Sequence, residues 1–188
     1  MSPGSQPCRA SGEYMDVDMN TGEIRAARCQ ITQCSVFLKK LRTKSIKYNC
    51  HIICFNADMM IGKAHARSAI LHAIRSFNEG NTISKTIEME ALLYASGSRQ
   101  CTIASSFGIH EGDNNIFVCC FPSQNGVWNA LAPLFTFVEE EWEIIDLEKR
   151  SRLMQHFGIT EKEIQTLTNP SRIADLVLER VALLQISR

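Results

Sequence analysis

The sequence predicts an α/β fold: a single domain in which helices pack on a small mixed β-sheet, with a block of helices in the middle of the chain. Two observations favour this fold. Short apolar runs typical of strands alternate with segments of helical period, and three helical segments follow one another without a strand between them. A chain of 188 residues, 45% of them hydrophobic, can form a core without disulfides or a metal ion.

The first elements follow from composition and apolar pattern. Residues 1–22 contain Pro3, Gly4, Pro7, Gly12 and Gly22, so we expect a poorly ordered or weakly docked tail, and a single domain over residues 23–188. We predict a strand over 23–31, a basic helix over 33–45, and a strand over 48–57. The apolar run in the last of these is typical of a central strand.

The remaining elements begin with three helices over 62–78, 85–95 and 99–107, followed by a strand over 116–121, where six apolar residues stand in a row. We then predict a helix over 128–137, a strand over 141–146, and helices over 147–157, 160–167 and 171–186. Gly108 and the pair Asn169-Pro170 mark helix ends.

The formal net charge is zero, but the charges are segregated along the chain. Residues 25–99 contain 12 basic and four acidic side chains, whereas residues 100–148 contain eight acidic side chains and no basic one. The neutral average therefore does not exclude a polyanionic partner.

The eight cysteines show no zinc-type pairing, and no secretory signal opens the sequence. We therefore predict reduced thiols that pack as small hydrophobes, no metal site, and a cytoplasmic location. The longest uncharged run, residues 114–138, contains amides and prolines and indicates a soluble protein. The common catalytic and phosphate-binding motifs are missing, which favours a binding protein without a cofactor over an enzyme. A thiol-dependent enzyme is an alternative that requires a cysteine of low pKa.

The predicted helix over 62–78 carries a polar stripe opposite its apolar arc. At 100° per residue the stripe contains His65, Ser68, His72 and Arg75, with Lys63 and Arg67 on its flank. The stripe is either an ordinary solvated face or a surface that contacts phosphates.

The segment Tyr94-Ala-Ser-Gly-Ser-Arg-Gln100 predicts a turn between two helices. Gly97 suits the left-handed end of the first helix, and Ser98 suits the N-cap of the second. Arg99 and Gln100 then occupy a first turn, where acidic side chains are usually favoured, which indicates either an anionic partner or a plain connection with an accidental arginine.

Apolar side chains cover an arc of about 220° on the predicted last helix, wider than one packing stripe. The excess apolar surface is covered either by the body of the protein or by a protein partner.

Residues 62–108, with the Ser-Gly-x-Arg-Gln turn, resemble the small kinase-binding subunit of the KEOPS complex, the TPRKB or Cgi family, in its archaeal form. The closing helix, Asp175-Leu-Val-Leu-Glu-Arg-Val-Ala-Leu-Leu-Gln, is also similar, and the resemblance extends over residues 24–188.

The resemblance implies a non-catalytic subunit with a mixed α/β fold. Such a subunit binds the small kinase-like ATPase of KEOPS and, in archaeal forms, recruits tRNA through its 3' CCA end for threonylcarbamoyladenosine modification. The resemblance and the residue patterns together predict a tRNA site formed by Ser96, Gly97, Ser98, Arg99 and Gln100, flanked by Lys63, His65, His72, Arg75 and Lys85. The expected kinase contacts are Leu176, Arg180, Leu183 and Leu184. The alternative is a regulatory subunit that binds the kinase and no RNA.

Overall fold

The computed structural model describes residues 22–139, 142–166 and 173–186. Their elements run in the order β1 (Glu23–Ile31), α1 (Cys34–Tyr48), β2 (His51–Asn56), η1 (Ala57–Met59), α2 (Lys63–Asn78), α3 (Ile87–Ser96), α4 (Cys101–Ala104), η2 (Ser105–Phe107), β3 (Gly112–Phe121), α5 (Val127–Leu131), β4 (Thr136–Val138), α6 (Leu147–Phe157), α7 (Glu161–Thr166) and α8 (Ile173–Ile186). The predicted α/β class, helices packed on one small sheet, is confirmed.

The four strands pair in the order β2-β3-β1-β4. All three pairings are antiparallel, so the sheet is not mixed as we expected. The register pairs Glu23 of β1 and Ile52 of β2 with the same residue of β3, Cys120. The first residues of β1 and β2 therefore lie at one end of the sheet, and β2 forms one of its edges.

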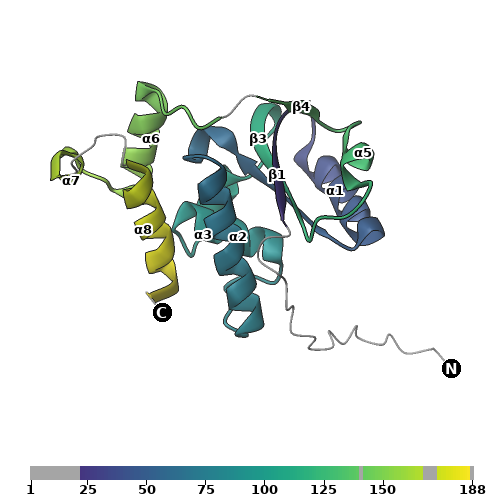
Figure 1. Ribbon diagram of the computed structural model, residues 1–188, viewed down its shortest axis with the longest axis horizontal. Coiled ribbons are helices and arrows are strands. Elements are labelled where there is room, and N and C mark those ends of the chain that lie inside the picture. The colour runs from purple at the N-terminus through teal and green to yellow at the C-terminus, as the bar shows by residue number, and fades with distance from the viewer. Residues whose placement is uncertain (1–21, 140–141, 167–172, 187–188) are drawn as a thin grey trace.

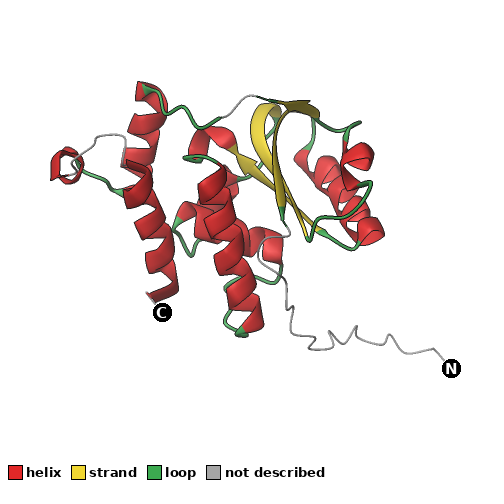
Figure 2. Cartoon of the chain, in the orientation of Figure 1, coloured by secondary structure: helices red, strands yellow, loops and turns green. Residues whose placement is uncertain are grey.

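Each face of the sheet is covered by its own group of helices. In Figures 1 and 2 the sheet lies between α1 and α5 on one side and α2 and α3 on the other, with α6 and α8 beyond the second group. Alternate residues of β3 enter the two cores: Phe117 and Cys119 belong to the core with α2, α3 and α8, whereas Ile116 and Val118 belong to the core with α1 and α5. This alternation is the period of two of a strand buried on both faces.

Two predicted elements are wrong. The helix expected over 128–137 ends at Leu131, and Thr136–Val138 form the edge strand β4 instead. Pro133 cannot supply a helical N–H, and the open edge of β1 offers backbone partners to the residues that follow. The strand expected over 141–146 is a loop at residues 142–146, where the Asp146 carboxylate caps α6 by accepting the Lys149 N–H at 2.7 Å. Glu141 lies outside the described residues.

Other elements differ mainly in extent. Strand β3 begins at Gly112, four residues before the predicted start, because the polar residues at its beginning pair with β1 as far as Ile31. The predicted tail, apart from Gly22, and the predicted cap at Asn169 and Pro170 lie outside the described residues. None of the described helices is long and apolar enough to cross a membrane.

Candidate functional site

The turn after α3 has the backbone geometry that its sequence predicts. Gly97 adopts φ 60° and ψ 23°, a left-handed conformation. Its N–H donates to the Tyr94 carbonyl at 3.0 Å, and the Ser98 N–H donates to the Leu93 carbonyl at 3.2 Å. These two bonds form a Schellman motif, which satisfies carbonyls at the helix end. A Cβ at Gly97 would lie 3.3 Å from Cε1 of Phe157, so both conformation and space favour glycine here.

The second half of the turn departs from prediction. Ser98 is not the N-cap of α4; its Oγ accepts the Gln100 N–H at 3.2 Å, and Gln100 itself is the N-cap residue. Arg99 and Gln100 are exposed and precede the helix. Helix α4 spans only four residues, with a 3-10 turn after it. A single turn has too small a dipole to attract an anion by itself, so any anion affinity depends on side chains.

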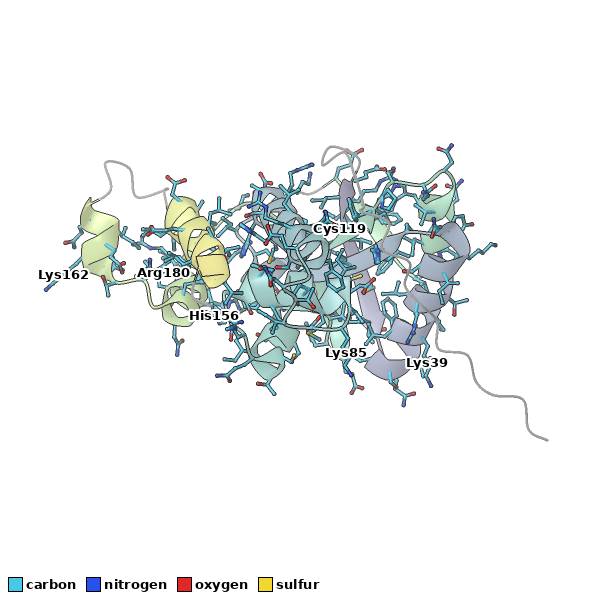
Figure 3. All side chains as sticks on the ribbon, turned by 90° about the horizontal axis from the view of Figure 1, so that it is seen from below. Lys39, Lys85, Cys119, His156, Lys162 and Arg180 are labelled. Atoms are coloured by element: carbon cyan, nitrogen blue, oxygen red, sulfur yellow. The ribbon has the colours of Figure 1, made fainter. Side chains whose placement is uncertain are left out.

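The turn opens into a surface pocket of about 390 Å³ that it shares with two distant helices. His156 and Phe157 at the end of α6 and Arg180 and Leu183 of α8 line the pocket together with residues 96–99. The His156 Nε2–H donates to the Ser96 carbonyl at 2.8 Å and joins α6 to the turn. Figure 3 shows His156 and Arg180 next to one another at this end of the molecule. Sequence reasoning missed His156, whose only signal is a cation-capable side chain in a last helical turn.

The guanidinium of Arg180 forms an ion pair within the protein. It donates to the Glu163 carboxylate at 2.6 Å, and its side chain is 29% exposed. The pKa of Glu163 is lowered, first by the hydrogen bonds from Thr160 and then by Arg180. Arg99 is exposed, so it is the pocket residue better placed to meet an anion from solvent.

The predicted outward stripe on α2 is wrong at His65. Its side chain is fully buried, because α2 packs against α3 and α8 as well as the sheet. The Nε2–H donates to the Ala95 carbonyl at 2.9 Å, and Nδ1 accepts the Ile61 N–H at 3.4 Å. Burial lowers the pKa of His65 to about 4. His65 is therefore a neutral core histidine that cannot contact RNA.

The other flanking residues are dispersed. Arg75 is exposed. His72 is half-buried, and its ring stacks on that of Tyr94 with 5.2 Å between the ring centroids. The Lys63 N–H donates to the Glu143 carboxylate at 3.1 Å, which brings the acidic segment against the start of α2. Lys85 lines a different groove beside α1. Tyr94, the nearest aromatic in sequence, is fully buried and offers no surface to a base.

Helix α8 buries most of its wide apolar arc in the protein itself. Ile173, Val177, Val181 and Leu184 lie in the core, and Leu176 is partly buried against it. Leu184, an expected kinase contact, is only 7% exposed, whereas Leu183 is 40% exposed. Of the α8 side chains that the structure describes, Leu183 is the large apolar one left exposed.

The described cysteines are all free thiols. Burial raises the pKa of Cys29 to about 11 and of Cys120 to about 12, and it also raises the pKa values of Cys34, Cys50, Cys54 and Cys119. A raised pKa suppresses the thiolate and opposes nucleophilic chemistry at these positions. Among the residues that the structure describes, no cluster of three or more His, Cys, Asp or Glu side chains could hold a metal ion.

Comparison with known families supplies one match. The sequence model of a family described as kinase binding protein CGI-121 matches residues 29–185. The matched span runs from the end of β1 to α8 and includes the turn and both helices that line the pocket. No curated protein sequence matches the chain.

Proposed function

Because the chain belongs to the CGI-121 family of kinase binding proteins, we propose that it is the non-catalytic subunit of an archaeal-type KEOPS complex. In this proposal it binds the small kinase-like ATPase and recruits tRNA through the 3' CCA end for threonylcarbamoyladenosine modification, in the cytoplasm. The observation that carries the proposal is the shared pocket, in which the Ser96–Arg99 turn lies beside the exposed Leu183 of α8.

The tRNA half of the proposal rests on the turn. Arg99 supplies charge for a terminal phosphate, and Gln100 and the hydroxyl of Ser98 are exposed or half-exposed hydrogen-bonding groups next to it. Arg75 and His72 lie on α2 as flanking candidates, and Lys63 is half-buried near Glu143. His65 is no longer included, because it is buried.

Charge reversal tests this site. We expect Arg99→Glu to weaken tRNA binding by about tenfold or more, because a repulsive charge replaces a phosphate contact. Lys162→Glu on α7 removes the same charge from an exposed position outside the pocket and should leave binding nearly unchanged. Filter binding with intact tRNA and with tRNA lacking its CCA end measures both effects. Equal affinity for the two RNAs would disprove recognition of the 3' end.

The kinase half of the proposal rests on Leu183. Exposed large apolar side chains of this kind anchor protein interfaces. We expect Leu183→Glu to abolish co-purification with the kinase-like ATPase, whereas Ile144→Glu, at a residue that is 83% exposed elsewhere, should not. Retained association in Leu183→Glu would move the interface away from α8.

A second candidate function is a regulatory subunit that binds the kinase and no RNA. It is favoured by the scarcity of exposed aromatic surface at the pocket: its one aromatic side chain other than histidine, Phe157, is 8% exposed, and Tyr94 is buried. Bases of single-stranded RNA are commonly held by aromatic stacking. In this case tRNA would show no salt-dependent binding, and Arg99→Glu would change neither RNA nor kinase association.

A further inference from the structure

A second and larger groove lies at the beginning of α3, whereas the pocket described above lies at the end of that helix. It has a volume of about 720 Å³ and is lined mainly by α1, by β2 and by residues around the start of α3. We call it the edge groove. Its volume is within the range of about 300–1,000 Å³ that is usual for sites that hold ligands.

The wall formed by α1 carries apolar side chains that the fold leaves exposed. Leu38, Arg42 and Ile46 line the groove at intervals of four residues, so they form one stripe along the helix. Leu38 is 52% exposed and Ile46 is 73% exposed. Helix α1 already packs on the sheet through Phe37 and Leu41, which are buried. The exposed leucine and isoleucine are therefore additional apolar surface, and apolar side chains that gather in one groove indicate a binding surface.

The floor of the edge groove is formed by β2. This strand pairs with β3 and stands at one end of the strand order within the described residues. Ile53 belongs to the core on the α3 side of the sheet, and Ile52 belongs to the core on the α1 side. The two helices therefore cover opposite faces, and the groove lies between them along β2. A strand at the end of a sheet presents backbone N–H and C=O groups with which an extended segment can pair.

An extended segment fits this arrangement better than a helix. A strand added to β2 would lie about 4.8 Å from it, and its side chains would point alternately to the two faces of the sheet. Side chains on one face would meet Leu38 and Ile46 of α1. Those on the other face would meet Phe77 and Leu92, which are partly buried against the core on the α3 side. A helix is about 10–12 Å wide with its side chains and would leave the backbone of β2 unpaired.

The charged side chains of the edge groove favour an acidic partner. Arg42 of α1 and Lys85, two residues before α3, line the groove and are exposed. Neither cation has an ion pair within the described residues, whereas Glu88, the acid among the lining residues, is hydrogen-bonded to Nδ1 of His51 at 2.8 Å. Figure 3 shows Lys39 of α1 on the same side of the molecule as Lys85. Carboxylates are complementary to these walls, whereas a second copy of α1, which carries five basic residues and no acidic one, would be repelled.

We propose that the edge groove binds an extended segment of a partner protein, with an apolar centre flanked by carboxylates, and that this segment adds to β2 as a further strand. The apolar centre would lie between α1 and the α3 side, and the carboxylates would meet Arg42 and Lys85. This interaction is independent of the proposed tRNA and kinase contacts, because neither Arg99 nor Leu183 lines the edge groove.

Fluorescence anisotropy with a labelled synthetic peptide, Glu-Asp-Val-Ile-Val-Asp-Glu, and the full-length protein tests the proposal. We expect this acidic peptide to bind at least about tenfold more tightly than a basic peptide with lysine at its four acidic positions. Two further peptides carry methyl groups on alternate backbone nitrogens, one on each set. One of them should bind at least about tenfold more weakly than the acidic peptide, because it lacks the N–H groups that face β2. No measurable binding of the acidic peptide, or full affinity of both methylated peptides, would overturn the proposal.

Variants of α1 locate the binding and separate the proposed occupant from others. Arg42→Glu should weaken binding of the acidic peptide by about tenfold and strengthen binding of the basic one, because the charge of the wall is reversed. Lys40→Glu makes the same charge change at an exposed position of α1 outside the groove and should alter neither affinity. Backbone amides of residues 51–56 should exchange more slowly when the acidic peptide is bound. Unchanged affinities in Arg42→Glu, a homodimer that Ile46→Glu dissociates, or tighter binding of single-stranded oligoadenylate than of the peptide would contradict the assignment.

Discussion

At the scale of single residues, the clearest constraint lies at Gly97, where the turn, the end of α3 and the ring of Phe157 meet. We expect Gly97→Ala to cost more free energy of unfolding than Gly158→Ala. Both glycines have a positive φ near 60° at a helix end, but a Cβ at Gly158 meets no atom within 4 Å. Alanine in this conformation costs about 1 kcal/mol at either position.

The difference between the two variants therefore reports the close contact with Phe157, whose ring packs against those of His65, Phe107 and His156 and has little room to move. Urea unfolding of both variants measures the difference. Equal losses would mean that the ring shifts without cost.

Residue His65 predicts a dependence of stability on pH. Its folded pKa of about 4 is below the ordinary value of 6.5, because burial disfavours the imidazolium. A depressed histidine pKa means that the unfolded chain binds the proton first, so stability is complete above about pH 6.5 and falls as the pH drops toward 4. When the pH falls from about 7.5 to about 5, the protonation of this residue should lower the free energy of unfolding by roughly 2 kcal/mol.

Urea unfolding across that pH range checks the expectation. His65→Gln keeps a donor for the Ala95 carbonyl and should flatten the profile, whereas His110→Gln, at an exposed position, should leave the profile as it is. An unchanged slope in His65→Gln would assign the acid sensitivity to other groups.

The thiols are the third residue-scale feature. Six described cysteines have raised pKa values, whereas Cys101 is exposed. We expect iodoacetamide to modify Cys101 first in the native protein and the buried thiols only on unfolding. Peptide mass spectrometry after timed alkylation measures this order. Rapid modification of Cys54 or Cys119 would instead support the alternative that the protein is a thiol-dependent enzyme.

At the scale of elements, two neighbouring leucines of helix α8 lie in different environments. Leu184 lies in the core at 7% exposed, and Leu183 faces outward at 40% exposed. We expect Leu184→Ala to lower the free energy of unfolding by about 2–4 kcal/mol, since it leaves a cavity. Leu183→Ala should change it by less than about 1 kcal/mol, which leaves that residue available for a partner. Chemical denaturation distinguishes the two, and a similar loss in both variants would mean that Leu183 is also part of the fold.

At the scale of the whole molecule, the folded chain changes what its charge pattern means. The basic and acidic halves are separate in sequence, but Glu143 lies against Gly62 and the N–H of Lys63. The acidic loop therefore lies at the start of α2, whereas Arg99 lies at the pocket and Arg42 and Lys85 line a separate groove beside β2.

This arrangement predicts a modest salt dependence for the proposed tRNA binding. If the CCA end contributes two or three phosphates, the logarithm of affinity should fall with the logarithm of salt concentration with a slope between about −1.4 and −2.1, because each phosphate on a single strand contributes about −0.7. Arg99→Glu should make the slope less steep by about 0.7, the contribution of one phosphate contact. Titrations at several KCl concentrations measure both slopes, and a slope far steeper than this would indicate a basic surface much larger than the pocket.

The sequence by itself determined the local features. Apolar runs predicted β2 and the second half of β3, helical period placed α2, α3, α6 and α8, and Gly97 specified a left-handed helix end. These are short-range effects of backbone conformation and side-chain periodicity, which a sequence displays directly. The prediction for His65 was wrong, because the sequence does not show how many neighbouring elements pack against α2. A histidine in a polar stripe is exposed if the helix packs on the sheet alone, but it is buried if other helices also cover that side.

Only the tertiary structure decided which distant residues share a surface. It placed the end of α6 and α8 beside the Ser96–Arg99 turn, separated Lys85 from that turn, and put β2 at one end of the strand order within the described residues. It also converted residues 136–138 from the end of a predicted helix into β4, since β1 offered an edge that local propensity cannot anticipate. Contacts between residues far apart in the chain depend on how whole elements pack. The packing therefore determines which residues come together in the candidate sites.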